Sequence, residues 1–315
     1  MSKQPTRRQA PKRRPQARKG RTVVAAHTAG KRSDRTSWII AGVVIAIGVA
    51  LVVVFAGASK KKITGADFFK GDKPVPASVL SKVIGVPQKT ITAVGKGSVT
   101  GLPLKLPGTT PLATADGKPR IVYLGAEYCP FCAAERWGMV QALSRFGTFK
   151  NLKITRSAVT APTGAGETDP NTPTFSFHGA TYTSPYLQFE PVEQEDNSYK
   201  TLETPTPEQA TLASTYDTQK YTGSSGSGSI PFVDFANEYM ISGASYDPGV
   251  LANLTHDQVA TALADSASDI SKGAIGTANA FTATVCKITD NKPAKVCDNS
   301  MIKDIQSQLP TKSLG

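Results

Sequence analysis

The sequence predicts an α/β sandwich outside a membrane, preceded by one transmembrane helix. Three observations lead to this prediction. A segment without charge, residues 38–58, follows a strongly basic N-terminus. The rest of the chain reads as strand, helix, strand, an insertion, a β-hairpin and helices, which is typical of one α/β domain. Two of the four cysteines stand three positions apart in the segment GAEYCPFCAAERW, directly after an apolar strand-like run.

Residues 1–36 hold most of the positive charge. They contain twelve Lys and Arg and one acid, Asp34, with almost no large apolar side chain, so we expect a disordered basic tail in the cytoplasm. The formal charge of +12 divides into +11 on this tail, +3 on residues 60–62 and −2 on everything that follows. The folded part is therefore nearly neutral, and we do not expect it to bind nucleic acid.

Residues 37–58 are expected to form a transmembrane signal anchor. Residues 38–58 carry no charge and would span about 30 Å as a helix in contact with lipid, which matches the hydrocarbon core of a bilayer. The excess of Lys and Arg ahead of the segment orients the N-terminus toward the cytoplasm. Cleavage after Ala58 is the alternative, although the apolar run is longer than that of a typical signal peptide. Either outcome leaves the C-terminal domain outside the membrane.

The exported part divides into a polar tether, residues 59–76, and a folded domain, residues 77–315. Within the domain we expect a buried strand at 120–126, a helix from Ala133 that stops at Gly147, and a second strand at 151–158. Thr206 and Gln209 have the spacing of a capping box, and Thr255 is placed to cap another helix. The other expected elements are a short helix within 76–86, a β-rich segment at 89–94, a hairpin at 175–192, a flexible run at 222–229, a hairpin within 230–245 and a long helix ending near Cys286.

Cys129 and Cys132 could be a redox couple, two metal ligands or a structural disulfide. A redox couple requires one cysteine that ionises readily and a partner within bonding reach. At the start of a helix, Cys129 would face unpaired backbone N–H groups and the positive end of the helix dipole, and Cys132 would lie one turn further on. Pro130 fits this placement, because proline at the first helical position removes no hydrogen bond.

The segment YLGAEYCPFC resembles the active-site strand and turn of the thioredoxin fold, and SIPFVDF resembles the segment that carries its cis-proline. The resemblance implies a cis peptide bond between Ile230 and Pro231 opposite the cysteines, with the backbone near Ile230 pairing with substrate. It also implies a large insertion at about 160–228, between the CxxC helix and the cis-proline strand. Over residues 65–310, the chain is similar to membrane-anchored, thioredoxin-like proteins of actinobacteria catalogued as domain of unknown function 929.

One position departs from the thioredoxin pattern. Thioredoxins usually place a buried acid six residues before the first cysteine, and here that position is Tyr123. Glu127 is the nearest acid and would lie near the site, although it could equally be a solvated surface residue. Tyr128 and Phe131 are also expected near the site, together with Pro130. The route by which Cys132 loses its proton is thus left open.

Cys286 and Cys297 are expected to form a structural disulfide. Ten residues containing Asp290, Asn291 and Pro293 separate them, which indicates a helix, a turn and a return. Closing a loop of this size would stabilise the fold by roughly 2 to 3 kcal/mol in the chain-entropy account. A zinc site of all four cysteines is the alternative, but the wide second spacing is unlike that of a zinc-ligand pair, and no metal site is predicted.

These features lead to a functional hypothesis with one rival. We expect a membrane-tethered thiol-disulfide oxidoreductase that acts on exported proteins, with Cys129 attacking, Cys132 resolving and Pro231 shaping the substrate groove. Oxidation or isomerisation is favoured over reduction because of the compartment, no cofactor is expected, and an unidentified redox partner must recycle the pair. The rival is a non-catalytic cell-envelope protein that keeps the fold and binds through the insertion.

Overall fold

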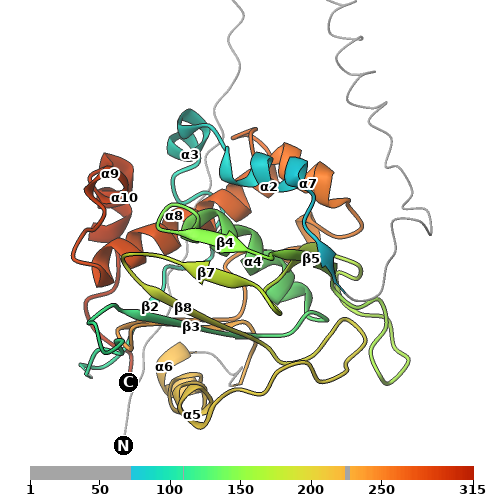
Figure 1. Ribbon diagram of the computed structural model, residues 1–315, viewed down its shortest axis with the longest axis horizontal. Helices are drawn as coiled ribbons and strands as arrows, with labels where there is room; N and C mark the ends of the chain where they lie inside the picture. The colour runs from blue at the N-terminus through green and yellow to red at the C-terminus, as the bar shows by residue number, and fades with distance from the viewer. Residues whose placement is uncertain (1–71, 109, 224–227) are drawn as a thin grey trace, which may run out of the picture. The chain divides into compact units, whose positions relative to one another are not determined.

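A computed structural model describes residues 72–108, 110–223 and 228–315 (Figure 1). The basic tail, the segment expected to span the membrane, most of the tether and part of the flexible run 222–229 lie outside the described residues. Within the described ranges, no helix combines the length and the apolar character that a membrane crossing requires. The elements are β1 Lys73–Pro74, α2 Ala77–Ile84, α3 Gln88–Val94, β2 Leu104–Lys105, β3 Arg120–Gly125, α4 Pro130–Leu143, β4 Thr148–Lys150, β5 Lys153–Arg156, β6 Pro173–Ser176, β7 Thr181–Thr183, β8 Gln188–Glu193, α5 Pro207–Tyr216, α6 Gln219–Thr222, β9 Phe232–Phe235, β10 Tyr239–Ser242, the short 3-10 helix η2 Pro248–Val250, α7 His256–Ala262, α8 Asp269–Ile288, α9 Ala294–Cys297 and α10 Ser300–Ser307.

The main sheet has five strands in the order β2-β10-β9-β3-β8. Strand β3 pairs in parallel with β8 and antiparallel with β9, so the sheet is mixed. The side chains of β3 alternate between two apolar clusters. Ile121 and Tyr123 belong to the larger cluster, whereas Val122 and Leu124 belong to the smaller one. The expectation of a strand buried on both faces is confirmed.

Helices cover both faces of this sheet. Helices α4 and α8 lie on one side of β3 and β8, and α5 and α6 lie on the other (Figure 1). Small residues allow α4 and α8 to approach closely, since a Cβ atom at Gly138 would come within 2.5 Å of the Thr277 side chain. On the opposite face, Leu212 and Tyr216 of α5 pack in the same cluster as Val122. The molecule is therefore a layered α/β structure, as the sequence predicts.

The hairpin expected at 175–192 is wrong. This part of the chain contributes to three strands instead, and each pairs with a different partner: β6 with β5, β7 with β4, and β8 with β3. Pairing with strands elsewhere in the chain places Phe177 and Phe189 in the main core, where they pack edge to face with ring centroids 5.1 Å apart. The end of the expected tether is also part of the fold, because Lys73 pairs with Ile154 across β1 and β5.

The β-rich segment expected at 89–94 is a helix. Despite its β-branched residues, α3 begins after Pro87 and packs on α8. The Asn279 side chain of α8 donates hydrogen bonds to the carbonyl oxygens of Ile91, at 3.0 Å, and of Gly95, at 2.8 Å. The Gly95 carbonyl thereby gains a partner just after the last helical residue, and the Ile91 carbonyl, which also accepts from the Gly95 N–H, gains a second one. Tertiary contact with α8 therefore outweighs local propensity here.

Several local predictions are confirmed. Thr206 and Gln209 form the expected capping box of α5, and Thr255 caps α7. Strands β9 and β10 form the expected antiparallel hairpin. The CxxC helix begins at Pro130, directly after Cys129 and three residues before the predicted Ala133, and it ends at Leu143, four residues before the predicted stop at Gly147.

Candidate redox site

Cys129 caps the N-terminus of α4. It follows β3 after a short turn and has extended backbone angles, and Pro130 is the first helical residue. The Cys129 sulfur accepts a hydrogen bond from the backbone N–H of Cys132 at 3.2 Å. Cys129 is 5% exposed, so its sulfur lies at the edge of the protein interior. The sequence-based placement of this thiol at a helix start is thus confirmed.

The two thiols have opposite electrostatic surroundings. The hydrogen bond from the Cys132 thiol lowers the pKa of Cys129, and the backbone bond from Cys132 and the charge of Arg136 act in the same direction against burial. Cys132 is fully buried, and this burial raises the pKa of its thiol well above the ordinary value. The surroundings therefore make the Cys129 thiol the more acidic of the two.

The Ile230–Pro231 segment lies against Cys129. Strand β9 begins directly after Pro231 and pairs with β3, so this segment is brought to the end of β3 from which the cysteine turn departs. The peptide bond between Ile230 and Pro231 is cis, as the resemblance implies. The Cys129 sulfur and the carbonyl oxygen of Ile230 are 3.6 Å apart, within the range of a weak thiol hydrogen bond.

A buried ion pair, which sequence reasoning missed, lies behind the cysteines. Arg136 is one helical turn after Cys132 on α4, and its guanidinium donates to both carboxylate oxygens of Glu193, at 2.9 and 2.6 Å. Both side chains have no exposed surface. Arg136 also donates to the carbonyl oxygen of Ala126 at 2.6 Å, which holds the cysteine turn. The sequence offers one signal for this ion pair: Arg136 is a charged residue one turn after the second cysteine, in a helix of buried residues.

Glu127 and Tyr123 also belong to this buried polar region. Glu127 is 1% exposed, so the interpretation of Glu127 as a solvated surface residue is wrong. Burial raises the pKa of its carboxyl, while hydrogen bonds from Ser176 and Thr155 oppose the rise. The Tyr123 hydroxyl is fully buried, and its burial raises its pKa well above the ordinary value. Among the described residues, neither the Tyr123 hydroxyl nor one Glu127 oxygen has a hydrogen-bond partner.

An aromatic rim surrounds the turn that carries Cys129. Phe131 is 43% exposed, which is unusual for a large apolar side chain in this protein. Tyr128 stacks on Tyr199 from the β8–α5 loop, with ring centroids 4.2 Å apart. The Tyr199 hydroxyl in turn donates to Glu167 of the β5–β6 loop. Two loops remote in sequence therefore help form the rim, and the CxxC motif alone could not have revealed them.

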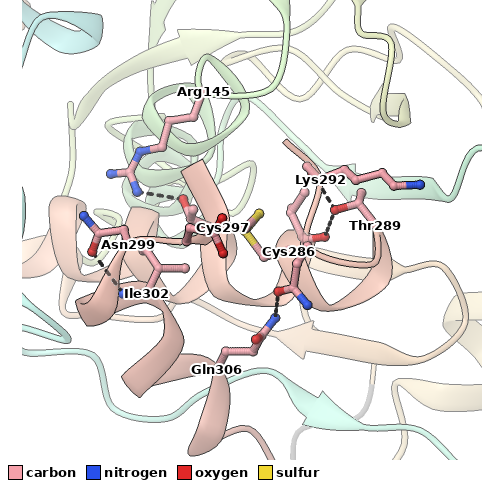
Figure 2. Close-up of a disulfide and its surroundings, with 12 residues drawn as sticks. Arg145, Cys286, Thr289, Lys292, Cys297, Asn299, Ile302 and Gln306 are labelled. Atoms are coloured by element: carbon pink, nitrogen blue, oxygen red, sulfur yellow. Dashed lines mark hydrogen bonds between the residues drawn. A yellow bond between two sulfur atoms is a disulfide. The ribbon is translucent and has the colours of Figure 1, made fainter. Parts of the chain in front are cut away.

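The second cysteine pair is a disulfide, as expected. Cys286 of α8 and Cys297 of α9 are bonded, with Cα atoms 5.5 Å apart (Figure 2). Both residues are fully buried. Their sulfurs are bonded to each other and so are not free thiolates. In the part of the chain that the structure describes, no cluster of three or more His, Cys, Asp or Glu residues is placed to hold a metal ion.

Comparison with known proteins identifies a protein family for this chain. The family model described as Domain of unknown function (DUF929) matches residues 109–287, and the chain belongs to this family. The match includes both members of the CxxC motif, the Ile230–Pro231 segment and Cys286. Neither the curated proteins nor the solved structures contain a significant match.

Proposed function

We propose that this member of the DUF929 family is a membrane-tethered, extracytoplasmic thiol-disulfide oxidoreductase that acts on exported proteins. The observation that carries the proposal is the position of Cys129, whose sulfur caps α4 and lies 3.6 Å from the carbonyl oxygen of Ile230. A thiolate at this position is stabilised by the helix start, and it is adjacent to a backbone segment that can pair with an extended peptide.

The arrangement of the strands supports a thioredoxin-like core. The strand before the cysteines, β3, has a parallel neighbour, β8, and an antiparallel neighbour, β9, which begins after the cis-proline. Helices α4 and α8 cover one face and α5 covers the other. In this interpretation β8 and α5 belong to the core. The inserted material within 160–228 is then mainly β6, β7 and their loops.

In the oxidising direction, the enzyme begins with a disulfide between Cys129 and Cys132. A substrate thiolate attacks the Cys129 sulfur, the enzyme disulfide breaks, and Cys132 leaves as a thiolate that takes a proton. A second substrate thiolate then attacks the substrate sulfur of the mixed disulfide and releases Cys129. The substrate has lost two electrons and the enzyme has gained them, so a membrane-bound disulfide-containing oxidant must restore the pair. Isomerisation uses the same mixed disulfide without net electron transfer.

The buried region behind the cysteines supports the proton step. Arg136 lowers the pKa of Cys132 against the effect of burial, so its charge favours the leaving thiolate. Glu127 has a raised pKa and interacts electrostatically with Arg136. We assign Glu127 the role of holding or releasing a proton in the buried region around Arg136, in place of the acid that thioredoxins have at the position of Tyr123.

The test is turnover by the full-length protein in detergent. We expect it to oxidise a reduced, unfolded protein when supplied with a small disulfide, and to catalyse insulin reduction when supplied with a dithiol. Cys129→Ser should lose both activities with an unchanged circular dichroism spectrum. Cys132→Ser should accumulate a mixed disulfide through Cys129, detectable by mass spectrometry. Absence of turnover in either direction in the wild type would favour the non-catalytic envelope protein.

A further inference from the structure

A pocket of about 320 Å³ opens at the end of α4 opposite to the cysteines. It lies between the α2–α3 segment, the C-terminal part of α4 and the α9–α10 segment. Ile84, Ile91 and Met301 contribute to its apolar wall, and Arg145 and Lys295 contribute positive charge. None of the described residues that line it is Asp or Glu. The volume lies at the lower end of the range for small-molecule sites.

Arg145 is held rigidly but without a counter-charge. Its guanidinium donates to the Thr282 hydroxyl at 2.8 Å, to the Gln141 side-chain oxygen at 2.6 Å and to the Asn279 side-chain oxygen at 3.0 Å. Figure 2 shows Arg145 reaching from α4 toward α8 beside the disulfide. All three acceptors are neutral, and they use three of the roughly five N–H donors of a guanidinium.

Two other arginines of the protein have the counter-charge that Arg145 lacks. Arg120 and Arg136 both form ion pairs with glutamates, whereas no described carboxylate lies within ion-pair distance of Arg145. Burial lowers the pKa of Arg145 to about 9, and no neighbouring acid opposes this shift. Arg145 is only partly buried, so its guanidinium can be reached from the pocket, and a cation whose partners are all neutral would be stabilised by a bound anion.

Two further features favour an anion in the same pocket. Lys295 is exposed, forms no ion pair among the described residues and lines the pocket. Helix α10 begins at Ser300, and Asn299, Met301 and Ile302 line the pocket. The Asn299 side chain already accepts from the backbone N–H groups of Met301 and Ile302, so the helix contributes the positive end of its dipole and no free donor from these two groups. The residues that line the pocket thus combine positive charge from Arg145 and Lys295 with apolar surface from Ile84, Ile91 and Met301.

We propose that this pocket binds a small amphipathic anion, with a carboxylate or phosphate group at Arg145 and Lys295 and an apolar body against Ile84, Ile91 and Met301. The site is separate from the proposed redox centre, because the 14 residues of α4 place its two ends about 20 Å apart. The inference therefore goes beyond the proposed function and does not depend on it.

The ligand test uses isothermal titration of the full-length protein in detergent with hexanoate and, as its neutral counterpart, hexanamide. We expect saturable binding of hexanoate and at least about tenfold weaker binding of hexanamide, a difference of about 1.4 kcal/mol. Equal affinity for the two compounds, or no binding of hexanoate, would overturn the proposal. Either result leaves the thiol-disulfide activity to be judged by its own assay.

Variants localise the site. Gln141→Glu supplies Arg145 with an internal carboxylate, so we expect hexanoate binding to be lost while the thermal midpoint stays the same or rises. Lys295→Met should weaken hexanoate binding by about tenfold without affecting folding, because this side chain is exposed. Lys287→Met, at an exposed lysine of α8 that does not line the pocket, is the matched control and should bind within about twofold of the wild type. Wild-type affinity in Gln141→Glu would overturn the assignment.

Discussion

The sulfur of Cys129 lies 3.6 Å from the carbonyl oxygen of Ile230, although 101 residues separate them in the sequence. Two antiparallel strands create this contact. Strand β9 begins directly after Pro231 and runs beside β3. A substrate peptide that paired with this segment would thereby be positioned with its sulfur near Cys129. The contact is the structural basis for the predictions on the two thiols.

Cys129 should react as a thiolate at lower pH than an ordinary cysteine. Its pKa is lowered, chiefly by the hydrogen bond from Cys132, whereas the pKa of Cys132 is raised well above the ordinary value by burial. Alkylation of the reduced protein across a pH series, followed by peptide mass mapping, should give a midpoint for Cys129 below about 8.5, the usual thiol value. Cys132 should remain unlabelled until the protein unfolds. A midpoint at or above the usual value would contradict the assignment of the attacking thiol.

Glu127→Gln should slow the resolving step. The substitution keeps the shape of a buried side chain but removes a group that can exchange a proton beside Arg136. We expect the mixed disulfide between Cys129 and a small thiol to resolve at least about tenfold more slowly, at the low end for general acid–base effects. Quenched-flow alkylation would measure this rate. Glu195→Gln, a partly exposed acid on the adjacent loop, is the control, and equal rates for both variants would remove Glu127 from the mechanism.

The two cysteine pairs should differ in their resistance to reduction. Cys286 and Cys297 are fully buried and remote from the Ile230–Pro231 segment, so thiol reagents reach them only when the protein opens. After equilibration in a graded thiol buffer, acid quenching and alkylation of the unfolded samples, label should appear at residues 129 and 132 at mild reducing poise. Residues 286 and 297 should be labelled only when strong reductant or denaturant was present during the equilibration. Labelling of all four together, or release of a stoichiometric metal ion, would overturn this division.

Glu193→Gln should destabilise the fold strongly. The change leaves the Arg136 guanidinium buried without its full counter-charge, and breaking a fully buried pair typically costs about 3–5 kcal/mol. The matched control is Glu208→Gln, which removes the exposed partner of Arg120 and should cost less than about 1 kcal/mol. Urea unfolding of both variants would measure the difference. Similar losses in the two would mean that the buried pair contributes no more than a surface one.

Asp234→Asn should flatten the pH dependence of stability. Burial raises the pKa of Asp234 in β9 to about 7, against 3.8 for the ordinary group. Between these values the folded state binds more protons than the unfolded state, so the free energy of unfolding falls as pH rises from about 4 to about 7. Asparagine mimics the protonated acid, so the variant should match the wild type near pH 4 and exceed it near pH 8. A parallel pH profile for both proteins, measured by thermal unfolding, would refute this.

The sequence by itself determined features that depend on neighbouring residues. Pro130 after Cys129 starts α4, and the Thr206–Gln209 spacing forms a capping box, because each signal acts within one helical turn. The β9–β10 hairpin likewise follows from a short turn, with positive φ at Ala236 and Asn237, between two apolar runs. Local hydrogen bonding suffices to specify each of these features.

Only the tertiary structure decided which distant segments meet. The sequence predicts a hairpin over residues 175–192. Strand β8 instead pairs in parallel with β3, which precedes the CxxC helix in the chain, and this pairing brings Glu193 to Arg136. Segment 88–94 is a helix that packs on α8, where the Asn279 side chain donates to the carbonyl oxygens of Ile91 and Gly95. Local propensities differ by fractions of a kcal/mol per residue, whereas burial of apolar surface and of a charged pair involves several kcal/mol, so long-range contacts prevail where the two conflict.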